Sequence, residues 1–253
     1  MLHIEVRGQG PDVVLLHGWA MNGAVWGEFA EKLAMHLRVH IVDLPGHGYS
    51  QASALSADLD TTLQVIVDAL PRHAHWIGWS LGGMLALCAA QRMPGAVDHL
   101  VLIDTSPSFV ASPTWQQGMP ENVFANFARQ LENDIETTMR RFLALQMLGL
   151  TDAQARARTL AQACLTRPAA TRESLEAGLT LLRATQLHHS LPAIEHPTLI
   201  VQGNLDRLVT PACARALAAR LKHAELAEVE NAGHAPFVSH SDRVAQRIVE
   251  FLS

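Results

Sequence analysis

The serine with the clearest chemical context is Ser80, in the pentapeptide Gly-Trp-Ser-Leu-Gly at residues 78–82. An apolar run over residues 75–77 precedes this turn, and a helix-like stretch over residues 81–92 follows it. A serine between two glycines at such a strand–turn–helix junction is typical of a nucleophile elbow. The glycines permit a tight turn, and the helix start favours developing negative charge. We therefore predict that Ser80 is a catalytic nucleophile.

A serine hydroxyl is a poor nucleophile unless a base takes its proton. The chain has 14 histidines, and we predict that His234 is the base. It follows the last apolar run and precedes the last helical stretch, which puts it on a loop at the same sheet edge as Ser80. For His17, at a strand end, we expect another role, and for His47 a place in a loop. Five further histidines are expected at the surface, at turns and helix edges: His188, His189, His196, His223 and His240.

Two aspartates could orient His234 and stabilise its charged form. Asp104 ends the apolar run over residues 100–103, and Asp206 lies in the loop over residues 203–209 after the next run. Both give the chain order serine, acid, histidine. We favour Asp206, because its loop is long enough to bring a carboxylate toward the histidine loop, and we keep Asp104 as the alternative.

Acyl transfer also needs backbone N–H groups aimed at the oxygen that becomes negative in the tetrahedral intermediate. One donor should be Leu81, directly after the nucleophile. The other should be Trp19, in the loop after the run 13–16, where Gly18 lets the chain turn back. The indole of Trp19 would also border the acyl group. Because these groups suffice for ester cleavage, we predict no metal and no organic cofactor.

Short apolar runs alternate with amphipathic stretches along most of the chain. The runs, typical of buried parallel strands, are 13–16, 39–42, 75–78, 100–103, 198–201 and 225–229. The helical stretches between them are 25–37, 59–70, 81–92, 212–221 and 242–252. This alternation predicts an α/β fold, with a mostly parallel twisted sheet flanked by helices.

The alternation stops between about residues 106 and 196, where no strand is expected. That stretch predicts helices over residues 122–132, 135–148, 152–164 and 172–185. Ligands of open α/β sheets bind beyond the carboxyl ends of the strands, so an insertion there is well placed to cover a site. We predict a core of residues 1–107 and 191–253 with a helical lid of residues 108–190 before the last two strands; a spacer away from the chemistry is the alternative.

The composition excludes several classes of protein. The 253 residues are 49% hydrophobic and 17% charged, with a net charge of −5. The chain as a whole therefore lacks the excess of basic residues that is typical of nucleic-acid-binding proteins. The sequence contains no run of about 18 apolar residues, so it predicts no membrane span. The N-terminus is typical of a strand and a turn rather than of a signal peptide. Cys88, Cys164 and Cys213 match neither a metal site nor a disulfide framework. We expect a cytoplasmic monomer.

Five segments together resemble the α/β-hydrolase superfamily over the whole chain: residues 15–19, 43–48, 78–83, 203–206 and 233–237. Within it, the chain is most similar to the biotin-synthesis carboxylesterases, the pimeloyl-[acyl-carrier protein] methyl ester esterases. Trp19, Trp79 and the segment Arg-Phe-Leu-Ala-Leu-Gln at 141–146 carry this narrower resemblance. It implies hydrolysis of the methyl ester of a pimeloyl chain on the acyl-carrier protein. The substrate contacts that follow are Trp19, Ser80, Leu81, Phe142, Leu143, Ala144, Leu145, Gln146 and His234.

The predicted lid is also basic. Residues 136–185 hold seven arginines and four acids, a balance of +3 in a chain of net charge −5. A basic lid on an acidic body suits docking of an acidic carrier. The resemblance implies that lid arginines make this contact; Arg141 and Arg158 match the family's positions, whereas Arg140 and Arg156 are offset. A solvated helix face is the alternative reading.

Other functions remain open at this point. One is a general short-chain carboxylesterase, or another lidded hydrolase that splits carbon–carbon or amide bonds of a small free substrate. Another is a ligand receptor that kept the fold and a slow triad, which the complete set of triad residues disfavours. A dehalogenase of this fold is disfavoured, because an aspartate would stand at the position of Ser80. Turnover of carrier-bound against free esters would separate the esterase alternatives.

Overall fold

The computed structural model describes residues 1–146 and 153–253. Its sheet has seven strands, in the spatial order β1-β3-β2-β4-β5-β6-β7. Their bounds are β1 (Ile4–Arg7), β2 (Asp12–Leu16), β3 (Arg38–Val42), β4 (Ala74–Trp79), β5 (Val97–Ile103), β6 (Thr198–Gly203) and β7 (Ala224–Val229). Only the β1–β3 pair is antiparallel among these strands. The predicted α/β fold with a mostly parallel sheet is confirmed.

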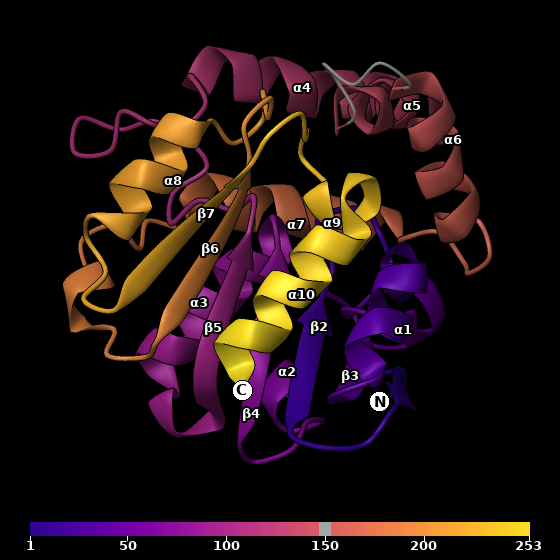
Figure 1. The fold of residues 1–253 in the computed structure, drawn as a ribbon. Helices are drawn as coiled ribbons and strands as arrows, with labels where there is room; N and C mark the ends of the chain where they lie inside the picture. The colour runs from indigo at the N-terminus through magenta and orange to yellow at the C-terminus, as the bar shows by residue number, and fades with distance from the viewer. Residues whose placement is uncertain (147–152) are drawn as a thin grey trace.

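Helices cover both faces of this sheet (Figure 1). One face carries α1 (Gly27–Ala34) and α10 (Ser241–Leu252), and the other carries α2 (Leu59–Val67), α3 (Leu81–Arg92) and α8 (Pro211–Ala218). Short helical segments join them: η1 (Gly23–Trp26), η2 (Gly48–Ser50), η3 (Pro94–Ala96), η4 (Leu191–Ala193) and α9 (Pro236–Ser239). In the described residues, no helix is long and apolar enough to cross a membrane.

The central strands are apolar on both sides because both of their faces are covered. In β2, Val14 and Leu16 pack with α2 and α3, whereas Val13 and Leu15 pack against the α1 and α10 side. Side chains alternate between the two faces of a strand, so a continuous apolar run fills two cores at once. This is why the runs in the sequence show no polar alternation.

Helix α1 is shorter than the stretch predicted over residues 25–37. The segment before it is the 3-10 turn η1, where the Asn22 side chain accepts the Ala24 N–H. Gly27 then has a φ of 35°, which ordinary helical backbone does not adopt. The apolar pattern of the sequence continues through this glycine, so it overestimates the length of the helix.

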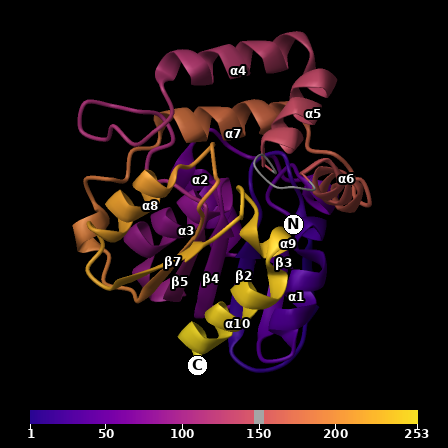
Figure 2. The ribbon, with the colours of Figure 1, turned by 45° about the horizontal axis from the view of Figure 1, so that its top comes forward.

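The insertion between β5 and β6 is helical, as predicted. It contains α4 (Glu121–Asn133), α5 (Ile135–Gln146), α6 (Ala153–Cys164) and α7 (Arg172–Ala184). Figures 1 and 2 show these helices above the carboxyl ends of the parallel strands. The predicted helices 135–148 and 152–164 extend partly into residues 147–152, which lie outside the described residues.

Candidate active site

Ser80 stands between β4 and α3 in a strained backbone conformation, with φ 55° and ψ −117°. Non-glycine residues rarely adopt a positive φ, so the surrounding structure must hold it there. A Cβ on Gly78 would lie 2.3 Å from the carbonyl oxygen of Gly82, and a Cβ on Gly82 would lie 2.1 Å from that of Leu16. Both positions therefore require glycine. The resulting turn presents the hydroxyl of Ser80 at the start of α3.

The imidazole of His234 is bonded to one carboxylate. Its Nδ1 lies 2.7 Å from Oδ2 of Asp206, and both side chains are buried. The other oxygen of Asp206 accepts the backbone N–H groups of Leu208 and Val209, at 2.7 and 3.1 Å. These bonds fix the carboxylate, so Nδ1 of His234 carries the proton and Nε2 is free to accept one.

The main chain of His234 is held from two directions. Trp79 Nε1–H donates to the His234 carbonyl oxygen at 2.6 Å. The His234 N–H donates to the carbonyl oxygen of Gln146, the last residue of α5, at 2.9 Å. The histidine loop is thus bonded both to the strand before Ser80 and to the helical insertion.

Asp104, the alternative acid, does not hold His234 in this structure. Its Oδ1 accepts the Gly203 N–H at 2.8 Å, and its Oδ2 has no partner among the described residues. Burial, and then the nearby carboxylate of Asp206, hold the pKa of Asp104 well above its usual range. This environment favours the neutral form of Asp104, whereas Asp206 is the residue in contact with the base.

The two residues predicted to supply the oxyanion hole, Leu81 and Trp19, belong to segments that adjoin Ser80. Leu81 is the first residue of α3, and the first N–H groups of a helix have no acceptor within it. The loop that carries Trp19 passes directly against the elbow, because a Cβ on Gly18 would lie 3.3 Å from the Cβ of Ser80. The Trp19 indole N–H donates to the Leu175 carbonyl of α7 at 2.9 Å, which fixes that loop.

Two other histidines of this region have structural roles. His17 is buried; its Nδ1 donates to the Gly18 carbonyl at 2.8 Å, and its Nε2 accepts the Leu44 N–H at 3.0 Å. Burial lowers the pKa of His17 well below its usual range, and that of His47 to about 4. His17 joins the loops after β2 and β3, whereas His47 bonds to the Pro45 carbonyl within its own loop and lies 5.2 Å from the His17 ring between centroids. The prediction that His188 lies at the surface is wrong: it is 2% exposed and contacts Ser108 Oγ at 3.1 Å.

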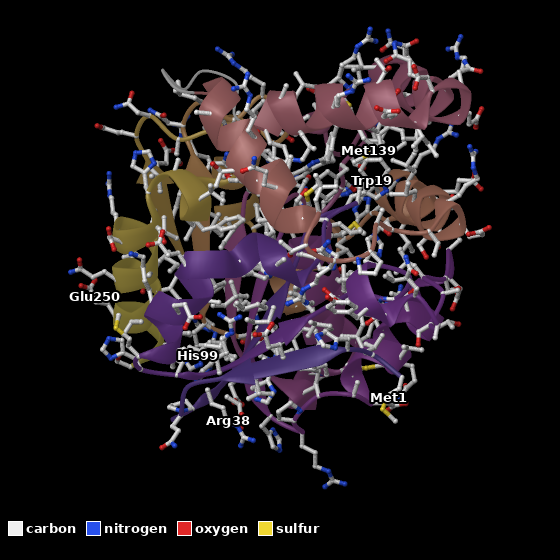
Figure 3. All side chains as sticks on the ribbon, turned by 90° about the vertical axis from the view of Figure 1, so that its right-hand side faces the viewer. Met1, Trp19, Arg38, His99, Met139 and Glu250 are labelled. Atoms are coloured by element: carbon white, nitrogen blue, oxygen red, sulfur yellow. The ribbon has the colours of Figure 1, made fainter. Side chains whose placement is uncertain are left out.

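A cavity of about 140 Å³ opens beside Ser80 and His234. Apart from these two residues its walls are apolar, and the insertion supplies most of them: Phe124, Phe127, Phe142, Leu145, Leu179 and Leu182, with Trp19 from the core. The Trp19 ring lies 5.6 Å from that of Phe127 and 5.1 Å from that of Phe142, between centroids, both edge-on. In Figure 3, Trp19 and Met139 of α5 lie toward the end of the molecule opposite Arg38 and His99.

The segment 142–146, predicted to contact the substrate, contributes unequally to this cavity. Phe142 and Leu145 line it, whereas Leu143 packs against the core on the α1 and α10 side. Ala144 is exposed, and Gln146 is buried but contributes its carbonyl to His234 instead. Leu81 is also absent from the lining and is fully buried.

Sequence reasoning missed the cavity residues from α4 and α7. Phe124 and Phe127 stand on one face of α4, and Leu179 and Leu182 on one face of α7. Spacings of three residues on amphipathic helices were the available signal. That signal gives a buried face but does not distinguish a cavity wall from an ordinary core.

Comparisons with known proteins agree with this geometry. The chain matches the alpha/beta hydrolase fold family over residues 11–241. It is 41% identical to the pimeloyl-[acyl-carrier protein] methyl ester esterase of Stenotrophomonas maltophilia strain R551-3, over 100% of this chain and 96% of that one. The enzyme of the same name from Xanthomonas axonopodis pv. citri is 40% identical, over 100% and 99%. The chain belongs to the α/β-hydrolase family.

The solved structure of an esterase from Exiguobacterium antarcticum superposes on this α/β-hydrolase with a TM-score of 0.89. It covers 99% of this chain and 94% of its own at 22% identity. An identity this low supports the shared fold alone.

The arginines of the hydrolase's insertion do not form one free basic surface. Arg140, Arg141 and Arg158 are exposed, with Arg140 3.4 Å from Glu136; the side chain of Arg156 lies outside the described residues. Arg167, which contributes to the local +3 balance, is 9% exposed and pairs with Glu5 and Asp43. Arg172 and Arg183 pair with Glu176 and Glu121. Part of the positive charge counted in the sequence is therefore neutralised within the protein.

Within the described part of the chain, one group of side chains could hold a metal ion by its spacing: Asp104, Asp206 and His234, whose ligand atoms lie within 4.8 Å of one another. The Asp206–His234 hydrogen bond uses two of these atoms. Two carboxyls and an imidazole in this arrangement also fit a hydrogen-bonded catalytic set, which requires no metal.

Proposed function

We propose that this protein is a serine carboxylesterase that hydrolyses the methyl ester of pimeloyl-[acyl-carrier protein] in biotin precursor synthesis. The observation that carries the proposal is the identity of 41% and 40% over the whole chain with esterases of that name. The apolar cavity beside Ser80 and His234 supports it, because a pimeloyl chain between its two ends is a row of methylene groups.

In the proposed reaction Ser80 is the nucleophile and His234 the base. Asp206 holds the Nδ1 proton, so Nε2 takes the proton of Ser80 as Oγ attacks the ester carbonyl carbon. The carbonyl oxygen becomes negative and is stabilised by the N–H groups of Trp19 and Leu81. His234 then gives the proton to the departing methoxide, which leaves as methanol.

The acyl-enzyme formed in this way is hydrolysed by the same residues. His234 takes a proton from water, the hydroxide attacks the acyl carbon, and Ser80 leaves with the proton returned by His234. The products are methanol and a free carboxylate at the far end of the pimeloyl chain. The strained elbow at Ser80 and the fixed Asp206 hold these groups in place before substrate binds.

We further propose that residues 108–190 act as a lid and that helix α5 has two roles. Its inner face contributes Phe142 and Leu145 to the acyl cavity, and its exposed face carries Arg140 and Arg141. With the methyl ester at Ser80, the carrier end of the substrate must lie outside the cavity. Exposed arginines on the same helix suit an acidic carrier at that position.

Turnover of two substrates tests the proposal. We expect the purified protein to release methanol from pimeloyl-[acyl-carrier protein] methyl ester with a higher kcat/KM than from p-nitrophenyl acetate, butyrate or hexanoate. Ser80→Ala should remove both activities. Equal or lower kcat/KM on the carrier-bound ester would favour a general short-chain carboxylesterase, and no ester hydrolysis at all would reject both readings.

A further inference from the structure

A buried carboxyl group outside the proposed mechanism lies beside the catalytic histidine. Asp104 follows β5 with a φ of 42° and is fully buried. Its Oδ1 accepts the Gly203 N–H at 2.8 Å, which ties the end of β5 to β6. Its Oδ2 accepts no hydrogen bond from any described protein group. The bond to the neighbouring strand accounts for one of the two carboxyl oxygens and leaves the other without a role.

The carboxyl group of Asp104 lies close to the catalytic pair. The ligand atoms of Asp104, Asp206 and His234 all lie within 4.8 Å of one another. β5 and β6 are parallel neighbours, so their carboxyl ends bring the two aspartates to the same edge of the sheet. His234 therefore has carboxyl oxygens of two aspartates within 4.8 Å of a ring nitrogen, although only Asp206 is bonded to it.

The two carboxyls must differ in charge. An ionised carboxylate at Asp104 would be buried without a donor to its Oδ2 and would face the charge of Asp206, which is strongly unfavourable. Burial first, and the Asp206 carboxylate second, raise the pKa of Asp104 well above its usual range. The titratable neighbours on this side are Asp206 and His234, with the Cys213 thiol close to Asp206.

We propose that Asp104 is a reserve positioning residue for His234, neutral while Asp206 is ionised and able to hold the imidazole when the Asp206 carboxylate is removed. The proposal rests on the serine mechanism above, but not on the carrier-bound substrate. Removing the carboxylate of Asp206 removes its repulsion, and the imidazolium of the transition state then stabilises an ionised Asp104.

Two substitutions of Asp206 should differ in effect. In Asp206→Asn the N–H groups of Leu208 and Val209 keep the amide oxygen in place, so the NH2 group faces Nδ1. That donor forces the wrong tautomer of His234 and blocks Asp104, and kcat should fall by about 10⁴-fold. Asp206→Ala leaves Nδ1 free to turn to Asp104, and its kcat should exceed that of Asp206→Asn by at least about tenfold.

The pH profile of Asp206→Ala separates an ionising partner from a structural effect. Activity would require ionised Asp104, and burial still raises the pKa of that group. The variant's kcat should therefore be lost as pH falls through that raised pKa, with a midpoint above that of the native enzyme. Adding Asp104→Asn should cost at least about tenfold more in the Asp206→Ala background than in the native one.

The rates are measured on p-nitrophenyl acetate, so the test remains valid even if the enzyme does not prefer carrier-bound esters. If the native enzyme does not hydrolyse this ester at all, the proposed function itself is rejected. Thermal unfolding of each variant checks the fold. An Asp206→Ala variant no more active than Asp206→Asn, or insensitive to Asp104→Asn, overturns the proposal. Carboxyl ¹³C shifts of the native protein give an independent check: Asp104 should remain protonated at neutral pH, and a titration at the ordinary aspartate pKa would also overturn it.

Discussion

Two hydrogen bonds hold the main chain of His234, in addition to the bond that its ring makes with Asp206. Trp79 donates its indole N–H to the His234 carbonyl at 2.6 Å, and Gln146 accepts the His234 N–H at 2.9 Å. The loop that carries the base is thus fixed relative to the strand that carries the nucleophile. Small displacements of a base are costly, because proton transfer requires hydrogen-bonding distance.

Trp79→Phe should therefore lower kcat with little change in KM. It removes one hydrogen bond and keeps an aromatic ring, and a neutral bond is worth about 1 kcal/mol, or about fivefold in rate. Trp76→Phe is the matched control, because Trp76 is buried in the same strand and its Nε1 has no partner among the described residues. If steady-state kinetics show equal losses for the two variants, the effect is one of packing.

At this scale the sequence carries strong information about Ser80 and weaker information about its acid. The Gly-x-Ser-x-Gly pattern predicts the strained turn because only glycine fits at residues 78 and 82. The choice between Asp104 and Asp206 depends on how the loop 203–209 folds. In the structure, the backbone N–H groups of Leu208 and Val209 hold the Asp206 carboxylate. Residue types alone do not predict these backbone hydrogen bonds.

Helix α5 joins an apolar inner face to a charged outer face. Phe142 contacts the Trp19 ring and lines the cavity. Phe142→Ala should therefore lower kcat/KM for long acyl esters by a factor that corresponds to roughly 1–3 kcal/mol of lost transition-state binding, and it should leave acetate esters nearly unaffected. A series of p-nitrophenyl esters measures this. Leu131→Ala is the control, because Leu131 is buried in the insertion but does not line the cavity. Loss of the same size on every ester would contradict an acyl-binding role.

The exposed arginines should act on association. Reversing Arg141 and Arg158 to glutamate should lower kcat/KM for the carrier-bound ester, and the loss should shrink at high salt, since screening acts over about 8 Å at physiological ionic strength. Small free esters should be unaffected. Arg38→Glu with Arg72→Glu is the control, because both residues are exposed and lie at the amino ends of the parallel strands, Arg38 at the first residue of β3 and Arg72 just before β4. Equal loss on free and carrier-bound esters would make the charges structural.

The helices and strands themselves follow closely from the sequence. Thr171 and Thr210 cap α7 and α8 by accepting N–H groups of the first turn, and the two helices begin within one residue of their predicted starts at 172 and 212. The cavity could not be predicted in the same way. It is formed by one face each of α4, α5 and α7 together with Trp19, and their mutual placement depends on tertiary packing.

The whole molecule is a core joined to an insertion by buried polar contacts as well as apolar ones. Arg167, just after α6, pairs with Asp43 Oδ1 at 2.9 Å and with Glu5 Oε2 at 2.7 Å. Asp43 is fully buried and also accepts the Gly23 N–H. The charge balance of the sequence could not separate this internal arginine from surface ones, because burial depends on the completed fold.

Arg167→Ala should lower the free energy of unfolding by about 3 kcal/mol, because it leaves the buried carboxylate of Asp43 without its cation. Arg183→Ala is the control: Arg183 pairs with Glu121 at the surface, with 61% of its side chain exposed, and should cost less than about 1 kcal/mol. Urea denaturation of both variants measures the difference. Similar small losses would show that Arg167 contributes little to joining the insertion to the core.

Covalent trapping of the nucleophile tests the account most directly. An alkyl fluorophosphonate should add once to the native protein, and peptide mass spectrometry should place the adduct on Ser80. Ser108 is the informative comparison, because its Oγ lies 3.1 Å from Nδ1 of the buried His188. Ser80→Ala should abolish both labelling and turnover, whereas Ser108→Ala should retain both. Labelling at another residue, with turnover kept in Ser80→Ala, would contradict the account.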